Sequence, residues 1–237
     1  MRIIFVRHGE PNYELDCLTE EGRKQAAAAA ERLAGEGISE IYASSCGRAA
    51  ETASYTARRL NLPVTTLDYM HEISWGGENV PEEGHPWTLG DRMLENGFDF
   101  FGQDWQAHPF FRENLARDYY RMIAGEIDAF LAGQGYLHDE RRFFCRQEME
   151  KTIALFSHGG SGACVLAHLL NLPFPYVCSV LPYDFTSVII LNFPVRPGAW
   201  VFPRIELFND AAHIRKKPSA PFLQQISENR LQEEFRG

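Results

Sequence analysis

The sequence predicts one three-layer α/β domain, in which a mostly parallel mixed sheet carries helices on both faces. Strand-like and helix-like segments alternate through the first 67 residues, which is typical of a parallel sheet. A chain of 237 residues with 45% hydrophobic residues can bury one large core. We therefore expect a single domain over residues 1–210 with an insertion at about 74–135, followed by a surface tail over 211–237.

The first half of the chain supplies three expected strands and two expected helices. The strands cover residues 2–6, 38–43 and 63–67, and the helices cover 19–34 and 48–60. The alanine-rich centre of the first helix favours helical structure, and Gly35 and Gly37 end it.

The segment 74–111 interrupts the alternation because it is rich in glycine, proline and aromatic residues. A segment of this length is usually functional or contains small elements of its own. We expect it to pack over one end of the sheet, as a local aromatic mini-core or as a lid over the site. A long amphipathic helix over 114–131 follows it.

Regular alternation resumes after residue 150. A buried strand is expected over 152–156 and a helix over 161–170. Two late strands, at 185–193 and 200–208, are expected to be joined by a turn at Pro197-Gly198.

Composition argues against several classes of partner. Lys and Arg number 23 against 32 Asp and Glu, a balance of −9, which disfavours nucleic acid and anionic membrane surfaces. The apolar start is too short for a secretory signal, and the longest apolar stretches are too short to span a bilayer. Five cysteines without a CxxC pair indicate reduced thiols in a cytoplasmic protein. We expect a small-molecule partner, and the sequence carries no signal for an oligomeric state.

Three short polar segments, 7–10, 44–48 and 157–160, each follow a predicted strand. Ligands of open α/β sheets bind beyond the carboxyl ends of the strands, so we expect these segments to meet in one crevice. The crevice would contain two arginines, two histidines and a helix N-terminus. These groups suit a phosphate dianion.

Four motifs follow one another along the chain. They are Arg7-His8-Gly9-Glu10, Leu18-Thr19-x-x-Gly22-x-x-Gln25-Ala26, Ser44-Ser45-x-x-Arg48-Ala49-x-Glu51-Thr52-Ala53 and Ser157-His158-Gly159-Gly160. Their order and spacing resemble the histidine phosphatase superfamily, which contains the cofactor-dependent phosphoglycerate mutases and related phosphatases. The resemblance covers roughly residues 1–75 and 150–210 and leaves the insertion unmatched.

The resemblance implies hydrolysis of phosphomonoesters through a phosphohistidine on His8, without a metal or cofactor. A neutral imidazole would attack phosphorus in line. The resemblance also implies that Arg7, Arg48 and His158 bind the phosphoryl oxygens and match the charge of the transition state. The further expected substrate-binding residues are Asn12, Ser44 and Gly159.

The proton for the leaving oxygen is expected to come from Glu72, which lies in a segment similar to the acid loop of the family. A carboxyl in this role needs a raised pKa and then acts as a base toward water. Glu78, Glu82 and Glu83 in the neighbouring loop are alternatives for this role.

One departure favours a phosphatase over a mutase. Five residues beyond Gly9, the mutases have an asparagine that helps hold phosphate, whereas this chain has Glu14, with Asn12 two residues earlier. The long mutase-specific stretch after it is also missing. Phosphoglycerate mutase is therefore the second hypothesis for the function, and a non-catalytic phosphate- or phosphopeptide-binding adaptor is the third.

Two other site types fit the sequence less well. Cys17 and Arg23 have the Cys-x5-Arg spacing of cysteine-dependent phosphatases, but Glu20 and Glu21 between them would repel an anion. No histidine stands at the HExxH position after His71-Glu72, so no metal site is expected there.

Overall fold

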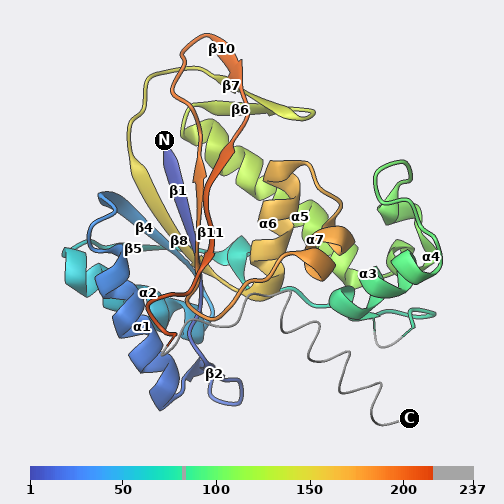
Figure 1. The fold of residues 1–237 in the computed structure, drawn as a ribbon, viewed down its shortest axis with the longest axis horizontal. Helices are drawn as coiled ribbons and strands as arrows, with labels where there is room; N and C mark the ends of the chain where they lie inside the picture. Colours follow the sequence, from blue (N-terminus) through green and yellow to red (C-terminus); the bar gives the residue numbers. More distant parts are fainter. Residues whose placement is uncertain (82–83, 216–237) are drawn as a thin grey trace.

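A computed structural model describes residues 1–81 and 84–215, so the expected tail over 211–237 falls largely outside the described residues. The central sheet has the order β11-β9-β1-β8-β4-β5 (Figure 1). Its strands are β1 (Arg2–Arg7), β4 (Ile38–Ser44), β5 (Val64–Leu67), β8 (Thr152–Ser157), β9 (Val188–Asn192) and β11 (Arg204–Asp210). β1, β8, β4 and β5 are parallel, whereas β9 is antiparallel to both of its neighbours. The predicted mixed, mostly parallel sheet is confirmed.

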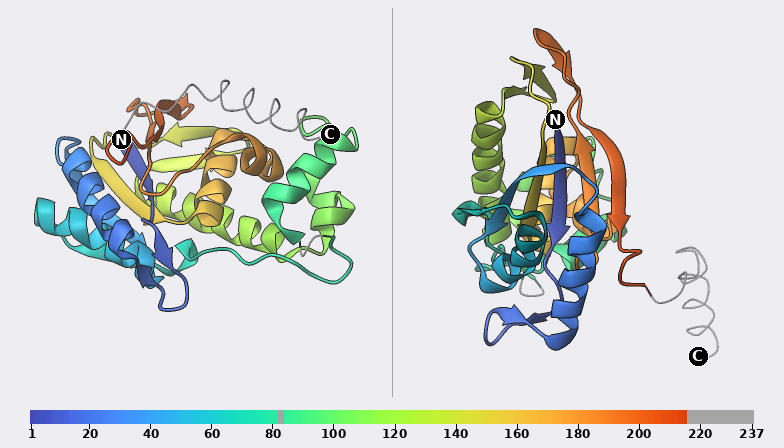
Figure 2. Two further views of the ribbon diagram at one scale, coloured as in Figure 1. Left: turned by 60° about the horizontal axis from the view of Figure 1, so that its bottom comes forward. Right: turned by 90° about the vertical axis from the view of Figure 1, so that its left-hand side faces the viewer.

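The two faces of the sheet are buried under different helices. In β1, Ile3 and Phe5 pack into one hydrophobic cluster, and Ile4 and Val6 pack into the other. The first face is covered by α5 (Leu115–Gly133) and α6 (Gly159–Leu170), and the second by α1 (Glu20–Leu33) and α2 (Gly47–Leu60). In the left view of Figure 2, α1 and α2 lie across the sheet from α6. The predicted helices are thus confirmed, with small shifts at their ends.

The loop after β1 is held against the start of α1 by close backbone contact. A Cβ atom on Gly9 would lie 2.6 Å from the carbonyl oxygen of Gly22, and one on Gly22 would collide with the carbonyl oxygen of Glu10. The Thr19 side chain caps α1 at Gly22 N (3.0 Å) and donates to the Glu10 carboxylate (2.8 Å). The Gln25 side chain accepts from the Glu10 amide at 2.8 Å. The second sequence motif therefore positions the loop that carries His8.

The aromatic insertion forms short helices that extend one helical layer. They are α3 (Pro86–Glu95), η3 (Trp105–Ala107) and α4 (Pro109–Arg112). α3 packs against α7 (Phe174–Val180), and α4 packs against α5. The expectation that the insertion packs over one end of the sheet therefore needs correction. Its helices bury Trp105 and Phe111 against the neighbouring helices, and of its described residues Trp75, His85 and Trp87 line the cavity described below.

Several elements were not expected from the sequence. They are the short pair β2 (Pro11–Asn12) and β3 (Cys17–Leu18), the hairpin β6 (Tyr136–Asp139) and β7 (Arg142–Cys145), and helix α7. The expected strand over 200–208 is divided into β10 (Ala199–Val201) and β11, with Pro203 between them. β10 pairs with β7 in a separate three-stranded sheet, whereas β11 pairs with β9. Proline cannot donate to a strand ladder, which explains the break.

Within residues 1–81 and 84–215, no single helix is long and apolar enough to cross a membrane. α6 and α7 reach that length and composition only when they are taken together across a bend of 117°. All five cysteines are free thiols.

We expect Gly22→Ala to lower the free energy of unfolding by about 1–3 kcal/mol, because the added methyl overpacks the contact with Glu10. Gly125→Ala is the matched control. Gly125 lies on the exposed side of α5, where a Cβ meets nothing within 4 Å, and the change should stabilise the protein by about 0.5–1 kcal/mol. Urea unfolding measures both, and equal effects of the two changes would contradict the packing argument.

Candidate active site

His8 lies directly after β1 and is only 1% exposed. Its Nδ1 lies 2.7 Å from the Gly9 carbonyl oxygen. Because a carbonyl only accepts, Nδ1 carries the proton, and the lone pair of the neutral ring is on Nε2. Burial, together with the charges of Arg7 and Arg48, lowers the pKa of His8 to about 4. The ring is therefore neutral near pH 7 and presents an unprotonated nitrogen.

A second buried imidazole, that of His158, follows β8 and is fully buried. The two histidine rings have their centroids 5.1 Å apart. His158 Nε2 lies 2.8 Å from Ser44 Oγ, which also accepts from the Cys46 amide at 3.1 Å. The Ser44 hydroxyl can thus donate to Nε2, and the ring proton is then on Nδ1. Burial, followed by the charge of Arg48, lowers the pKa of His158 to about 2.

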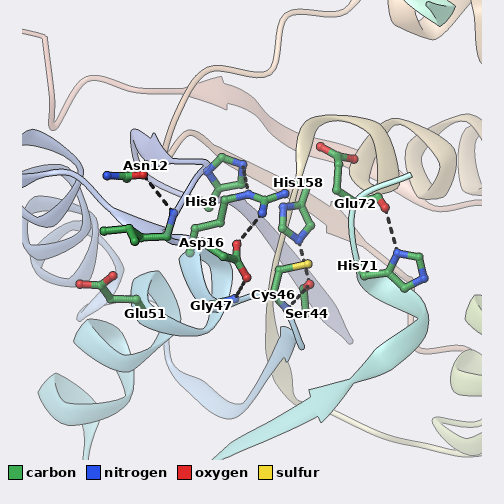
Figure 3. A network of polar contacts seen from close by, with 12 residues as sticks. His8, Asn12, Asp16, Ser44, Cys46, Gly47, Glu51, His71, Glu72 and His158 are labelled. Carbon is green, nitrogen blue, oxygen red and sulfur yellow. Dashed lines mark hydrogen bonds and ion pairs between the residues drawn. The ribbon is translucent and has the colours of Figure 1, made fainter. Parts of the chain in front are cut away.

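Arg48 lies in the first turn of α2 and is 8% exposed. Its Nε is 3.4 Å from His8 Nε2, and its Nη1 is 2.6 Å from Asp16 Oδ1. The other Asp16 oxygen accepts from the Gly47 amide at the start of the same helix, at 2.6 Å (Figure 3). One carboxylate therefore orients the guanidinium and caps α2. Burial works against the ionised carboxylate, but these hydrogen bonds and the Arg48 charge lower the pKa of Asp16 below its usual value.

Sequence reasoning did not single out Asp16. The sequence feature that could have indicated it is an acidic residue in the short connection between β1 and α1. Its backbone has a φ of 46°, a left-handed conformation that aspartate tolerates better than most residues. That turn is what brings the side chain to α2.

Arg7 ends β1 on the other side of His8. Its Nη1 donates to the Tyr183 carbonyl oxygen, and its guanidinium lies 4.4 Å above the centre of the Phe185 ring. A Cβ atom on Gly159 would lie 3.6 Å from the guanidinium carbon. Arg7 is therefore fixed beside the N-terminus of α6.

Glu72 follows the short helix η1 (Asp68–Met70) and caps α6. Its Oε1 accepts from the amides of Ile73 (3.0 Å), Gly160 (3.0 Å) and Ser161 (3.1 Å). Burial raises the pKa of Glu72, although these bonds and the charges of the two arginines oppose the shift. A Cβ atom on Gly160 would lie 2.6 Å from Oε1, so this approach requires glycine.

The structure brings together most of the residues expected to form the site. The group consists of Arg7, His8, Ser44, Arg48, Glu72, His158 and Gly159. Asn12 differs, because its Oδ1 accepts from the amides of Glu14 and Leu15, both at 3.1 Å, within its own loop (Figure 3). Among the alternative acids, Glu78 is exposed, and Glu82 and Glu83 lie outside the described residues.

A cavity of about 510 Å³ opens beside this group. Arg7, Glu72 and Gly159 are among the residues that line it. The insertion contributes Trp75, His85 and Trp87 to its wall, and the segment 177–183 contributes the end of α7 and the loop after it.

Three further side chains could hold a metal ion. Asp128, His138 and His168 place one ligand atom each within 4.8 Å of one another, at the end of α6 away from His158. Asp128 Oδ1 accepts from both imidazoles, at 2.9 and 2.8 Å. These bonds tie α5 and β6 to α6, so the cluster already has a structural role without an ion.

Comparison with known proteins agrees with the geometry. The chain matches the histidine phosphatase superfamily (branch 1) over residues 3–124. It is 26% identical over 242 residues to the probable phosphoglycerate mutase GpmB of Yersinia enterocolitica, covering 90% of this chain and 95% of that protein.

Solved structures with the same fold include two phosphatases. A mutant phosphoserine phosphatase from Entamoeba histolytica in complex with phosphoserine has a TM-score of 0.60 at 22% identity, covering 90% of this chain and 99% of that one. A mycobacterial glucosyl-3-phosphoglycerate phosphatase with inorganic phosphate has a TM-score of 0.60 at 23% identity, with the same coverage. The family match spans more than half of the sequence, and this chain therefore belongs to the histidine phosphatase superfamily, branch 1.

Proposed function

We propose that this protein hydrolyses phosphomonoesters through a phosphohistidine intermediate on His8. The observation that carries the proposal is a buried neutral imidazole whose unprotonated Nε2 faces a guanidinium, with a second imidazole beside it. Such a ring is a competent nucleophile toward phosphorus. The family contains phosphatases and mutases, so the proposal selects one of two related activities.

The phosphoryl group of the substrate binds to fixed N–H donors before it is transferred. Arg7 and Arg48 supply planar N–H donors for the phosphoryl oxygens, and His158 supplies the N–H of its neutral ring. Asp16 keeps the Arg48 guanidinium oriented toward His8 by holding Nη1. These fixed donors match the charge of the transition state without reorganisation.

The first chemical step transfers the phosphoryl group. His8 Nε2 forms a bond to phosphorus while the ester P–O bond breaks, and the Glu72 carboxyl gives its proton to the leaving oxygen. A raised pKa suits Glu72 to this role, because more of the carboxyl is protonated at a given pH.

The second step returns the enzyme to its starting state. The Glu72 carboxylate takes a proton from water as the water oxygen attacks phosphorus. The P–N bond breaks, phosphate leaves, and His8 is again neutral.

Phosphoglycerate mutase is the second candidate, because the GpmB relative carries that description. A mutase returns the phosphoryl group to a bound glycerate rather than to water. Interconversion of 2- and 3-phosphoglycerate that is stimulated by bisphosphoglycerate and exceeds phosphate release would favour it over the phosphatase. A non-catalytic adaptor, the third reading, would bind phosphate ligands without turnover.

Phosphate binding tests the first part of the mechanism. Arg48→Ala should weaken the binding of inorganic phosphate about 10- to 100-fold, because a charge-assisted hydrogen bond is lost. Arg58→Ala on the same helix is the control, since Arg58 is exposed and packs over Tyr55. Isothermal titration calorimetry measures both, and equal losses would place the anion elsewhere.

Turnover tests the nucleophile and the acid. His8→Ala should abolish phosphate release from benzyl phosphate. We expect mass spectrometry to detect an alkali-stable phosphoenzyme in the unmodified protein and none in His8→Ala. Glu72→Gln should lower kcat by about 10²–10⁴ with phosphate affinity retained. Glu78→Gln, in the neighbouring exposed loop, is the control and should leave kcat unchanged. A large loss in Glu78→Gln with normal Glu72→Gln would reassign the acid.

The pH profile follows from the two shifted pKa values. His8 acts unprotonated, so kcat/KM should fall as the pH drops through its pKa of about 4. Glu72 acts protonated, so activity should fall as the pH rises through its raised pKa. The profile should therefore be bell-shaped, with His8 limiting the acid side and Glu72 the alkaline side, and Glu72→Gln should remove the alkaline limb. An alkaline limb that persists in Glu72→Gln would contradict the role of Glu72.

A further inference from the structure

The cavity beside Glu72 contains almost no charge beyond the proposed phosphate site. Of the described side chains that line it, Arg7 is the only arginine or lysine and Glu72 the only carboxylate. The Arg7 guanidinium donates to the Tyr183 carbonyl oxygen. In the proposed mechanism its other N–H groups bind the phosphoryl oxygens. A carboxylate or a second phosphate on the leaving group would thus meet no cation inside the cavity. Burying an unpaired charge is costly, so such substrates are disfavoured.

One wall of the cavity is aromatic. The Trp75 ring lies 4.9 Å from the His85 ring and 6.3 Å from the Trp87 ring, and His85 lies 5.2 Å from Trp87, all between centroids. These edge-to-face and tilted contacts fix the rings before a ligand arrives. Trp75 keeps 36% of its surface exposed, so it has area left to cover a ligand.

A second part of the wall is largely aliphatic and comes from α7 and the loop after it. Val177, Val180, Leu181 and Pro182 line this part. Val180 remains 43% exposed. Because α3, which carries Trp87, packs against α7, the aromatic and aliphatic parts belong to neighbouring elements. The volume of about 510 Å³ accommodates a ring system.

We propose that the substrate is the phosphate monoester of an uncharged aromatic alcohol, whose ring binds between Trp75 and Trp87 on one side and Val180 and Leu181 on the other. This inference rests on the proposed phosphatase function and gives it a substrate class. Proton transfer from Glu72 to the leaving oxygen releases a neutral alcohol, which suits a cavity without a partner for charge. The same cavity disfavours phosphoglycerate and phosphoserine, which carry a carboxylate.

The first experiment compares matched substrates on the unmodified protein. Benzyl phosphate, 4-carboxybenzyl phosphate and ethyl phosphate have alcohol leaving groups, and 3-phosphoglycerate adds an aliphatic carboxylate. We expect kcat/KM for benzyl phosphate to exceed that for each of the other three at least tenfold. Equal or better use of either carboxylate substrate overturns the substrate class while leaving the phosphatase proposal intact. Failure to release phosphate from all four overturns the phosphatase proposal itself.

The second experiment changes the wall. Trp75→Leu should raise KM for benzyl phosphate roughly three- to tenfold and should raise KM for ethyl phosphate by a smaller factor, because the larger alcohol contacts more of the ring. Trp200→Leu is the control, since Trp200 is 45% exposed on β10 in the separate small sheet. Equal KM changes in the two variants would overturn the assignment of the wall.

The third experiment looks for a variant that gains activity toward a charged substrate, because misfolding of a variant could not produce such a gain. Val180→Lys places a cation in the cavity and should raise kcat/KM for 4-carboxybenzyl phosphate relative to benzyl phosphate about tenfold. Val180→Gln, of similar length and without charge, should not produce this shift. An unchanged ratio in Val180→Lys would show that the alcohol does not bind along this wall and would overturn the proposal.

Discussion

Burial of His8 between two guanidiniums is the constraint on which the rest of the site depends. Low exposure and the charges of Arg7 and Arg48 make protonation of the ring unfavourable, so its pKa falls to about 4. The bond from Nδ1 to the Gly9 carbonyl then decides which nitrogen keeps a lone pair. A solvated histidine at the same point would be partly protonated near neutral pH and would be a poorer nucleophile.

Two glycines allow close contacts that hold the surrounding groups in place, because a side chain at either position would collide with its neighbour. Gly22 allows the loop after β1 to lie against α1, and Gly160 allows the Glu72 carboxylate to reach the N-terminus of α6. At Glu72, burial favours the protonated form while three amide donors favour the ionised form, and burial prevails. The pKa of Glu72, the proposed proton donor, therefore reflects burial, which raises it, and hydrogen bonds from backbone amides, which lower it. The amides of α6 can reach the carboxylate because residue 160 is a glycine.

Asp16 shows how a short connection changes a phosphate site. Its carboxylate holds Arg48 and the first amide of α2, where a longer loop would contribute other side chains. A negative charge here offsets part of the positive field, yet it also fixes the guanidinium beside His8. Trp75 and Trp87 line the cavity next to the site, so the proposed sites for the phosphoryl group and for the alcohol are built from separate parts of the chain.

The alternation of strands and helices and the three polar segments at strand ends could be predicted before folding was considered, because hydrophobic periodicity and motif order are local properties. The convergence of His8, Arg48 and His158 followed from the parallel strand order. The folded chain was needed to reveal the role of Asp16, the hydrogen bonds of Asn12 within its own loop, and the placement of α7 and the insertion. The role of Asp16 and the placement of α7 and the insertion depend on contacts between segments distant in sequence, which no local pattern encodes. Asn12 is instead held by the amides two and three residues after it.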